Sequence, residues 1–216
     1  MSSVKLLVTR PEYDIVTSYL SSWAQDALQL ADKLNIRFND LGCENVNRKE
    51  FEKRMKAMNP SFVFLNGHGT ADSISGHNSE IILQTNENDS LLKNKIVYAL
   101  ACESASSLGL SAIDKGALSY IGYAQPFAIL TDANSESVPE DDKLAQWFKE
   151  PAVQVSETIL RGKSTQVAYE KSQNKYKELI RKLSSSDAFL EAKEVRFWLF
   201  WNMTSQRLLG DRDTVM

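Results

Sequence analysis

The sequence predicts an α/β fold in which helices cover both faces of a mostly parallel sheet. Residues 62–65 and 96–101 are unbroken apolar runs rich in β-branched and aromatic side chains. Such runs are typical of strands buried on both faces of a parallel sheet. Segments with helical spacing separate the predicted strands, which is the alternation that βαβ units show.

The N-terminal third begins this alternation. Val4–Val8 is a short apolar strand that Arg10-Pro11 ends, and residues 13–34 carry apolar side chains at three- and four-residue spacings, as an amphipathic helix does. Residues 36–41 alternate apolar and polar side chains and predict a second strand.

The next helix has a start signal and a stop signal. Asn47, with Glu50 three residues later, is a capping-box pattern, and Pro60 limits the far end. The strand that runs to Asn66 follows, and the apolar triplet 81–83 predicts an edge strand or a hairpin.

After the second apolar run, residues 105–113 predict a short helix that Gly116 terminates, and residues 120–123 predict a further strand. Residues 131–142 are polar and acidic and predict an exposed loop. Pro151 suits the first position of the next helix, which we expect to end at Gly162.

The C-terminal part is predicted from three features. Residues 164–183 form a long, polar and basic helix, the serines at 184–186 mark a break, and a helix or strand rich in aromatic residues follows at 197–201. We expect one domain over residues 1–216, with the aromatic-rich segment 183–216 packed on it.

Composition narrows the function classes. The 216 residues carry 25 basic and 28 acidic side chains, a net charge of −3, which argues against a nucleic-acid partner. No apolar stretch approaches the roughly 20 residues that cross a bilayer, so no membrane partner is expected. The N-terminus has no export signal, which predicts a cytoplasmic protein whose Cys43 and Cys102 are reduced thiols.

Both apolar runs lead into residues with catalytic chemistry. Asn66-Gly67-His68-Gly69 follows the first run, and Cys102 follows the second. Because ligands of open parallel sheets lie beyond the carboxyl ends of the strands, we expect the imidazole and the thiol at the same edge. Attack on an amide needs a nucleophile, a proton acceptor and donors for the oxyanion. Cys102 can supply the thiol, His68 the base, and the N–H groups of Gly69 and Cys102 the oxyanion hole.

Each of these residues also has a simpler interpretation. A single histidine is usually a surface residue, and a single cysteine at a strand end is usually a small buried hydrophobe. The pair at matching strand ends, with glycines around the histidine, favours catalysis. A module that binds a partner without cutting it is the alternative, and another hydrolase or transferase that uses Cys102 is a third.

The segments around this pair resemble the caspase-like cysteine peptidases, which include caspases, metacaspases, gingipains, separase and bacterial CHAT domains. The resemblance is carried by the two strand-end motifs, by Ala99–Ser104 with Lys115–Gly122, by Ile159–Ser164, and by Leu208–Asp211, where Arg212 stands in place of an expected proline. It implies a three-layer caspase-like fold and a cysteine endopeptidase with His68 and Cys102 as the catalytic dyad. Gly69 and Cys102 would supply the oxyanion hole, protein or peptide would be the substrate, and no cofactor would be needed. The flanks Leu100 and Ser104 are not the glycines of a glutamine-amidotransferase turn.

Family members that cut after Arg or Lys place a carboxylate at the bottom of the substrate pocket, where it pairs with the basic side chain. Asp132, which follows the strand-like residues 127–130, is the first candidate for this acid, and Asp72 is the second. A solvated loop aspartate is the alternative for both.

The remaining candidates are weaker. His77 lies in a loop that we expect to be exposed and is a second choice for the base, and Cys43 is expected to be structural. No ligand spacing predicts a zinc site, and the acidic residues 140–142 are expected to be a solvated turn rather than a calcium site. The basic helix 164–183 is expected to be a solvated face, with docking of an acidic regulatory partner as the alternative, and the aromatic run 197–201 is expected in the core or at a domain seam.

Overall fold

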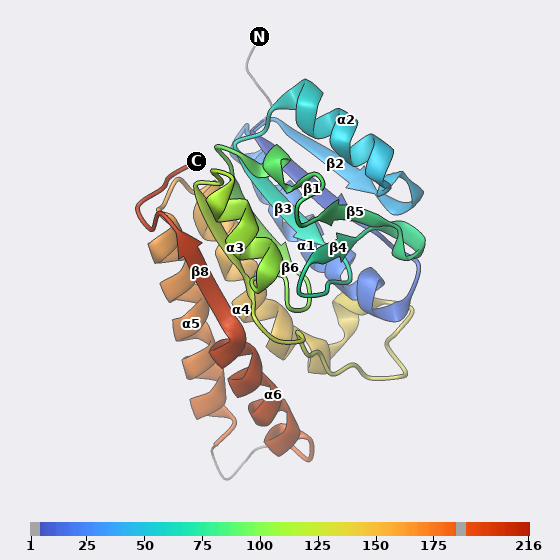
Figure 1. The fold of residues 1–216 in the computed structure, drawn as a ribbon. Coiled ribbons are helices and arrows are strands. Elements are labelled where there is room, and N and C mark those ends of the chain that lie inside the picture. Colours follow the sequence, from blue (N-terminus) through green and yellow to red (C-terminus); the bar gives the residue numbers. More distant parts are fainter. Residues whose placement is uncertain (1–4, 185–188) are drawn as a thin grey trace.

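The computed structural model describes residues 5–184 and 189–216, and it is built on a six-stranded sheet with the strand order β2-β1-β3-β6-β7-β8 (Figure 1). All neighbouring strands are parallel except β7 and β8, which are antiparallel. The strands of the sheet are β1 Leu6–Arg10, β2 Phe38–Gly42, β3 Phe62–Asn66, β6 Ile96–Leu100, β7 Ser119–Tyr123 and β8 Gln206–Gly210. The predicted α/β class and mostly parallel sheet are therefore confirmed.

Helices cover the sheet on both sides and give three layers. The helices are α1 Ile15–Lys33, α2 Arg48–Met58, α3 Ser107–Asp114, α4 Lys143–Leu160, α5 Thr165–Lys182 and α6 Ala192–Ser205. One core joins α1, α4, α5 and α6 to one face of the sheet, and a second core joins α2 and α3 to the other. Alternation along β1 separates the two, because Leu6 and Val8 belong to the first core and Leu7 to the second.

The expected hairpin is present outside the main sheet. Strands β4 Ser73–Ser75 and β5 Ile81–Gln84 pair antiparallel and lie on the side of α2 (Figure 1). The predicted N-cap of α2 is confirmed, since the Asn47 side chain accepts a hydrogen bond from Glu50 N. Val4 of the expected first strand and the serines 185 and 186 of the expected break lie outside the described residues.

The start of α4 differs from the prediction. The helix begins at Lys143, and Pro151 lies inside it rather than at its first position. Asp142 caps this earlier start, because its side chain accepts from Leu144 N and Ala145 N. A proline inside a helix costs about 3 kcal/mol, and the buried side chains of Ala145 and Phe148 offset that cost. Asp142 is itself fully buried, unlike the rest of the expected exposed loop.

The expected strand at residues 127–130 is wrong, and β8 was not expected. The segment after β7 has no regular structure, because β8 occupies the position beside β7 with five residue pairs. Ala128 pairs instead with Asn202 of α6.

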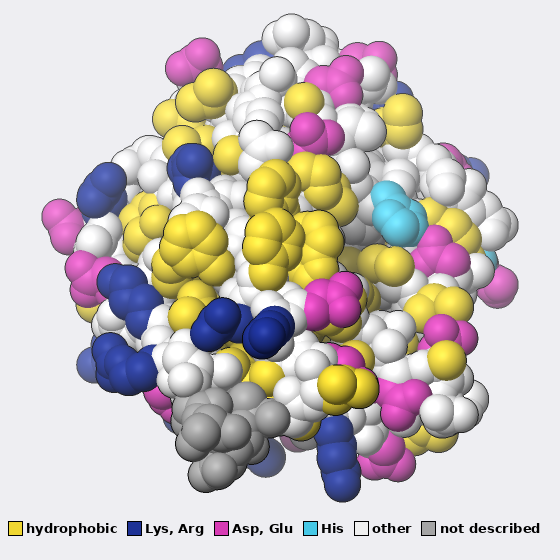
Figure 2. Space-filling model, turned by 90° about the horizontal axis from the view of Figure 1, so that it is seen from below, with side chains coloured by type: hydrophobic (Ala, Val, Ile, Leu, Met, Phe, Trp, Pro, Cys, Tyr) yellow, Lys and Arg dark blue, Asp and Glu magenta, His cyan; other side chains and the backbone are white. Residues whose placement is uncertain are grey.

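The aromatic run lies in α6 and is only partly in the core. Leu199 is fully buried, but the side chains of Phe197 and Phe200 are 57% and 54% exposed. Phe197 packs on Trp198, and Trp198 packs on Trp201. Figure 2 shows hydrophobic side chains gathered on the lower face of the molecule, with a histidine near them. The expectation of a buried run is therefore wrong for Phe197 and Phe200.

Candidate active site

The sheet register brings the two motif-bearing strand ends together. Strands β3 and β6 are direct neighbours, with Asn66 paired to Leu100. The residues that follow, Gly67 to Gly69 and Ala101 to Cys102, therefore leave the sheet at the same edge. Asn66 is fully buried and anchors this edge to β1, because its side chain donates to Thr9 O at 2.9 Å.

Close contact between Gly69 and Cys102 shows how tightly the two segments meet. A Cβ atom on Gly69 would lie 2.3 Å from Cys102 O and 3.0 Å from Cys102 N. Only glycine permits this approach. Within residues 5–184 and 189–216, neither the Gly69 N–H nor the Cys102 N–H donates a hydrogen bond to another residue. Both donors of the predicted oxyanion hole are thus available at one place.

His68 is bound by a carboxylate that the sequence analysis did not single out. Its Nε2 atom lies 2.6 Å from Asp14 Oδ2, and the two side chains are 40% and 38% exposed. Nε2 then carries the proton shared with the carboxylate, so Nδ1 is the ring nitrogen left to accept another. The pair joins an imidazole to a carboxylate through one short hydrogen bond.

Asp14 is itself held rigidly. It is the N-cap of α1, where its side chain accepts from Thr17 N and from the Thr17 hydroxyl. Burial opposes ionisation of Asp14, but the hydrogen bonds from Thr17 and His68 outweigh it and lower the pKa of the carboxyl. A signal was present in the sequence: Asp14 follows β1, and Thr17 completes a capping box. The adjacency of β1 and β3, which brings Asp14 to His68, could not be predicted from spacing alone.

The thiol of Cys102 contacts the segment after β7. Cys102 Sγ accepts a hydrogen bond from Phe127 N at 3.3 Å and lies 3.9 Å from Phe127 O. Burial raises the pKa of the Cys102 thiol, the Phe127 N–H opposes this, and Glu103 raises the pKa further. In the described part of the chain, the thiol makes no hydrogen bond with His68. The surroundings of Cys102 therefore disfavour its thiolate form.

The other histidine and the other cysteine have surroundings that differ from those of His68 and Cys102. His77 is half-buried rather than exposed as expected, and its Nδ1 is buried without a hydrogen-bond partner. The ring of Tyr13 packs edge-on against His68 at 6.0 Å and against His77 at 5.4 Å. Cys43 is exposed and lies 3.7 Å from Glu12, and burial of its sulfur together with that carboxylate raises its pKa.

The two aspartates predicted to bind substrate have local hydrogen bonds in turns. Asp132 is exposed and its carboxylate accepts from the backbone N–H and side-chain amide of Asn134. It lines a cavity of about 900 Å³ that neither His68 nor Cys102 lines. Asp72 is exposed and accepts from the hydroxyl of Thr70 at 2.6 Å.

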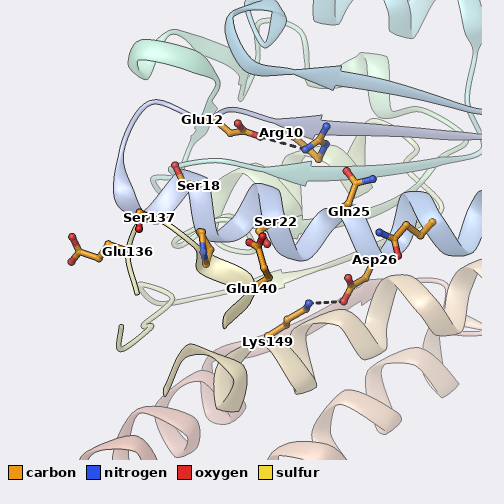
Figure 3. Close-up of a pocket in the computed structure, with 12 residues that line it drawn as sticks. Arg10, Glu12, Ser18, Ser22, Gln25, Asp26, Glu136, Ser137, Glu140 and Lys149 are labelled. Carbon is orange, nitrogen blue, oxygen red and sulfur yellow. Dashed lines mark hydrogen bonds and ion pairs between the residues drawn. The ribbon is translucent and has the colours of Figure 1, made fainter. Parts of the chain in front are cut away.

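A second cavity lies along α1, where Ser18, Ser22 and Gln25 line it (Figure 3). Its volume is about 670 Å³, within the range of ligand-binding clefts. Two of its basic side chains are paired, Arg10 with Asp40 and Lys149 with Asp26. The carboxylates that also line it are Glu12, Glu136 and Glu140.

In residues 5–184 and 189–216, none of the helices is both long and apolar enough to span a bilayer. The same residues contain no group of three or more His, Cys, Asp or Glu side chains placed to hold a metal ion.

The sheet order and the layers are those of a caspase-like fold. The chain is similar over 99% of its length to the gingipain RgpB of Porphyromonas gingivalis in a complex of its pro- and mature domains, with a TM-score of 0.63 and 11% identity. It is similar over the same share to the Arg-specific cysteine proteinase gingipain R (RgpB), with a TM-score of 0.57 and 11% identity. The chain spans about half of each of these structures, 48% in both cases. Neither a protein-family model nor a curated protein sequence matches the chain.

Proposed function

We propose that the chain is a cysteine endopeptidase in which Cys102 is the nucleophile, His68 the base and Asp14 the residue that orients the base. The observation that carries the proposal is the contact of the Gly69 backbone with the Cys102 backbone. This contact places the residue after the imidazole directly against the residue that bears the thiol. The fold shared with two gingipain structures supports the same reaction class.

The proposed chemistry begins with a proton transfer. His68 Nδ1 takes the proton of the Cys102 thiol, and Asp14 stabilises the resulting imidazolium through Nε2. The thiolate then attacks the peptide carbonyl carbon, and the N–H groups of Gly69 and Cys102 stabilise the new oxyanion.

Collapse of this intermediate breaks the C–N bond. The imidazolium of His68 protonates the leaving amine, which leaves a thioester on Cys102. A water molecule, deprotonated by His68, hydrolyses the thioester and regenerates the thiol. Because the resting pKa of Cys102 is raised by burial, the thiol depends on His68 for its activation.

We propose a peptide substrate with a basic residue before the scissile bond. The gingipain R structure is described as that of an Arg-specific proteinase. Asp132 is the candidate acid and Asp72 the second candidate. Profiling of cleavage with a positional-scanning peptide library compares the wild type with Asp132→Ala and Asp72→Ala. A preference for Arg or Lys that neither variant reduces would exclude both acids.

Activity itself is tested by substitution of the nucleophile. We expect Cys102→Ala to abolish cleavage of the library and His68→Ala to reduce it by about 10²- to 10⁴-fold. Cys43→Ala is the matched control, because this exposed thiol is expected to have no catalytic part. Cleavage that persists in Cys102→Ala would refute the proposal.

The second candidate function is an inert caspase-like module that binds a protein without cutting it. The observation that favours it is the thiol turned toward Phe127 with a raised pKa. The RgpB structure with its pro-domain shows that a protein of this fold binds a protein segment. In an inert module, Cys102 would react with iodoacetamide at neutral pH no faster than an ordinary buried thiol.

A further inference from the structure

Residues 124–128 form an irregular segment between the thiol and helix α6. This segment supplies both backbone contacts of Cys102 Sγ, the Phe127 N–H at 3.3 Å and the Phe127 carbonyl at 3.9 Å. Strand β7 ends at Tyr123, and residues 124–128 belong to neither a helix nor a strand. The place of the Phe127 N–H therefore depends on what holds the segment from outside.

Helix α6 holds the segment on both sides of Phe127. The buried side chain of Asn202 accepts from Ala128 N at 2.9 Å and donates to Ala128 O at 2.7 Å. On the other side, Trp201 Nε1 donates to Pro126 O at 2.8 Å. Pro126 and Ala128, the residues on either side of Phe127, are thus hydrogen-bonded to Trp201 and Asn202, respectively, which are consecutive residues of α6.

We propose that Asn202 is a positioning residue for the nucleophile: through the backbone of Ala128 it holds the Phe127 N–H on Cys102 Sγ. This inference rests on the proposed function and deepens it. When the thiol proton moves to His68 Nδ1, the S–H contact with Phe127 O is lost and the N–H becomes a donor to a charged sulfur. Hydrogen bonds to charged acceptors are about twice as strong as those to neutral ones, so the donor favours the thiolate.

Glu103, which is adjacent in the chain, is the charged group that acts on the thiol, and it raises the pKa of Cys102. Among the described residues, His68 makes its side-chain hydrogen bond with Asp14 and none with the sulfur. From α6, the groups that hold the segment are uncharged: the side chains of Trp201 and Asn202, and the carbonyl of Ser205, which accepts from Ala124 N. Replacement of Trp201 or Asn202 by an uncharged residue changes no charge beside the sulfur. A change in the pKa of the Cys102 thiol would therefore report a change in the position of the Phe127 N–H.

The test is the rate of Cys102 alkylation by iodoacetamide between pH 5 and 10. All variants carry Cys43→Ser, because Cys43 is exposed and would react as well. Asn202→Ala removes both bonds to Ala128, and Trp201→Phe removes only the bond to Pro126. Phe200→Leu is the matched control, because Phe200 is an exposed aromatic residue of the same helix.

We expect Asn202→Ala to move the midpoint of the pH–rate curve for alkylation upward by about one pH unit. This shift corresponds to about tenfold less thiolate at neutral pH. The limiting rate at high pH is expected to stay within about threefold, because thiolate nucleophilicity changes only weakly over one pKa unit. Trp201→Phe is expected to give a smaller upward shift, and Phe200→Leu none. An unchanged midpoint in Asn202→Ala and Trp201→Phe, with native circular dichroism, would overturn the inference.

If Asn202→Ala does not fold, Trp201→Phe decides: an upward shift supports the inference and an unchanged midpoint contradicts it. The alkylation needs no substrate, so it is independent of the peptidase assay. If the proposed function is wrong, the wild-type protein will not cleave peptides. Failure of the inference would appear as an unchanged midpoint in a protein that does cleave peptides.

Discussion

His68 is held in place by side chains of the loop after β1. Asp14 forms a hydrogen bond with its ring, and Tyr13 packs edge-on against it. The 2.6 Å contact between Asp14 and His68 orders the ring and decides which nitrogen is available to the thiol. Asp14 has a second role as the N-cap of α1. The proposed catalytic role of Asp14 and its structural role as an N-cap can be separated by the choice of substitution.

Asp14→Asn is expected to lower kcat/KM by about 10- to 100-fold, because an amide cannot stabilise the imidazolium. Asparagine is as good an N-cap as aspartate, so the free energy of unfolding should change little. Asp14→Ala is expected to lose activity and, in addition, about 1 kcal/mol of stability. Activity assays and urea unfolding of both variants check this. Wild-type kcat/KM in Asp14→Asn would show that the carboxylate has no part in the chemistry.

A methyl group on Gly69 tests the contact between the two motif segments. Gly69→Ala would place a Cβ atom 2.3 Å from Cys102 O, so the loop or the thiol residue must move. We expect a loss of about 1–3 kcal/mol in unfolding free energy and loss of peptide cleavage.

Gly162→Ala is the control for this steric effect. Gly162 has a positive φ of 70°, but no atom of the described residues lies within 4 Å of its Cβ position. It should therefore lose about 1 kcal/mol from backbone strain and keep its activity. Equal effects of the two substitutions on cleavage would contradict a specific contact at Gly69.

At the scale of elements, Asp142 joins the N-terminus of α4 to α1. Besides capping α4, its carboxylate accepts from the hydroxyl of Tyr19 at 2.6 Å and from Asp132 N at 2.8 Å. Burial opposes ionisation of Asp142, but the hydrogen bonds from Tyr19 and the backbone outweigh it and lower its pKa below the ordinary 3.8. This residue explains why α4 begins before Pro151.

The lowered pKa of Asp142 predicts the sign of the pH dependence. A depressed folded-state pKa adds stability that is complete above the unfolded pKa and is lost as pH falls through the folded one. Asp142→Asn is expected to lose about 2 kcal/mol at pH 7. Its stability should also fall less steeply than that of the wild type below about pH 4.

Asp141→Asn is the control for Asp142, because Asp141 is an exposed neighbouring carboxyl. Urea unfolding at a series of pH values measures both variants. Parallel stability curves for the wild type and Asp142→Asn below pH 4 would contradict the assigned role of Asp142.

At the scale of the whole molecule, α6 and β8 are bound into the same sheet and core as the N-terminal strands. Strand β8 pairs with β7, and Val195 and Leu199 of α6 belong to the core that contains Leu6. We therefore predict one cooperative unfolding transition for the chain. Tryptophan fluorescence and far-ultraviolet circular dichroism should give the same urea midpoint, since Trp23 lies in α1 and Trp201 in α6. Two separate midpoints would show that the C-terminal segment is an independent unit.

The parts of this molecule that the sequence predicted are those with local signals. Neighbouring residues suffice to predict the apolar runs that lead into Asn66 and Cys102, and the N-cap at Asn47. They do not suffice to predict the order of the strands in the sheet, and this order brings Asp14 to His68. For the same reason β8 was missed.

Two errors have a common physical origin. Residues 127–130 look like a strand by composition, but β8 occupies the neighbouring position in the sheet. Pro151 looks like a helix start, but Asp142 and the packing of Phe148 begin the helix earlier. In each case a contact distant in sequence outweighed a local preference.

Labelling with a peptidyl acyloxymethyl ketone, followed by mass spectrometry, tests most directly whether His68 and Cys102 work as a pair. We predict a single adduct on Cys102 in the wild type and in Cys43→Ala, and no adduct in Cys102→Ala. The rate of labelling should fall by about 10²-fold or more in His68→Ala. Labelling of Cys102 at the same rate with and without His68, or an adduct on Cys43 instead, would contradict the dyad.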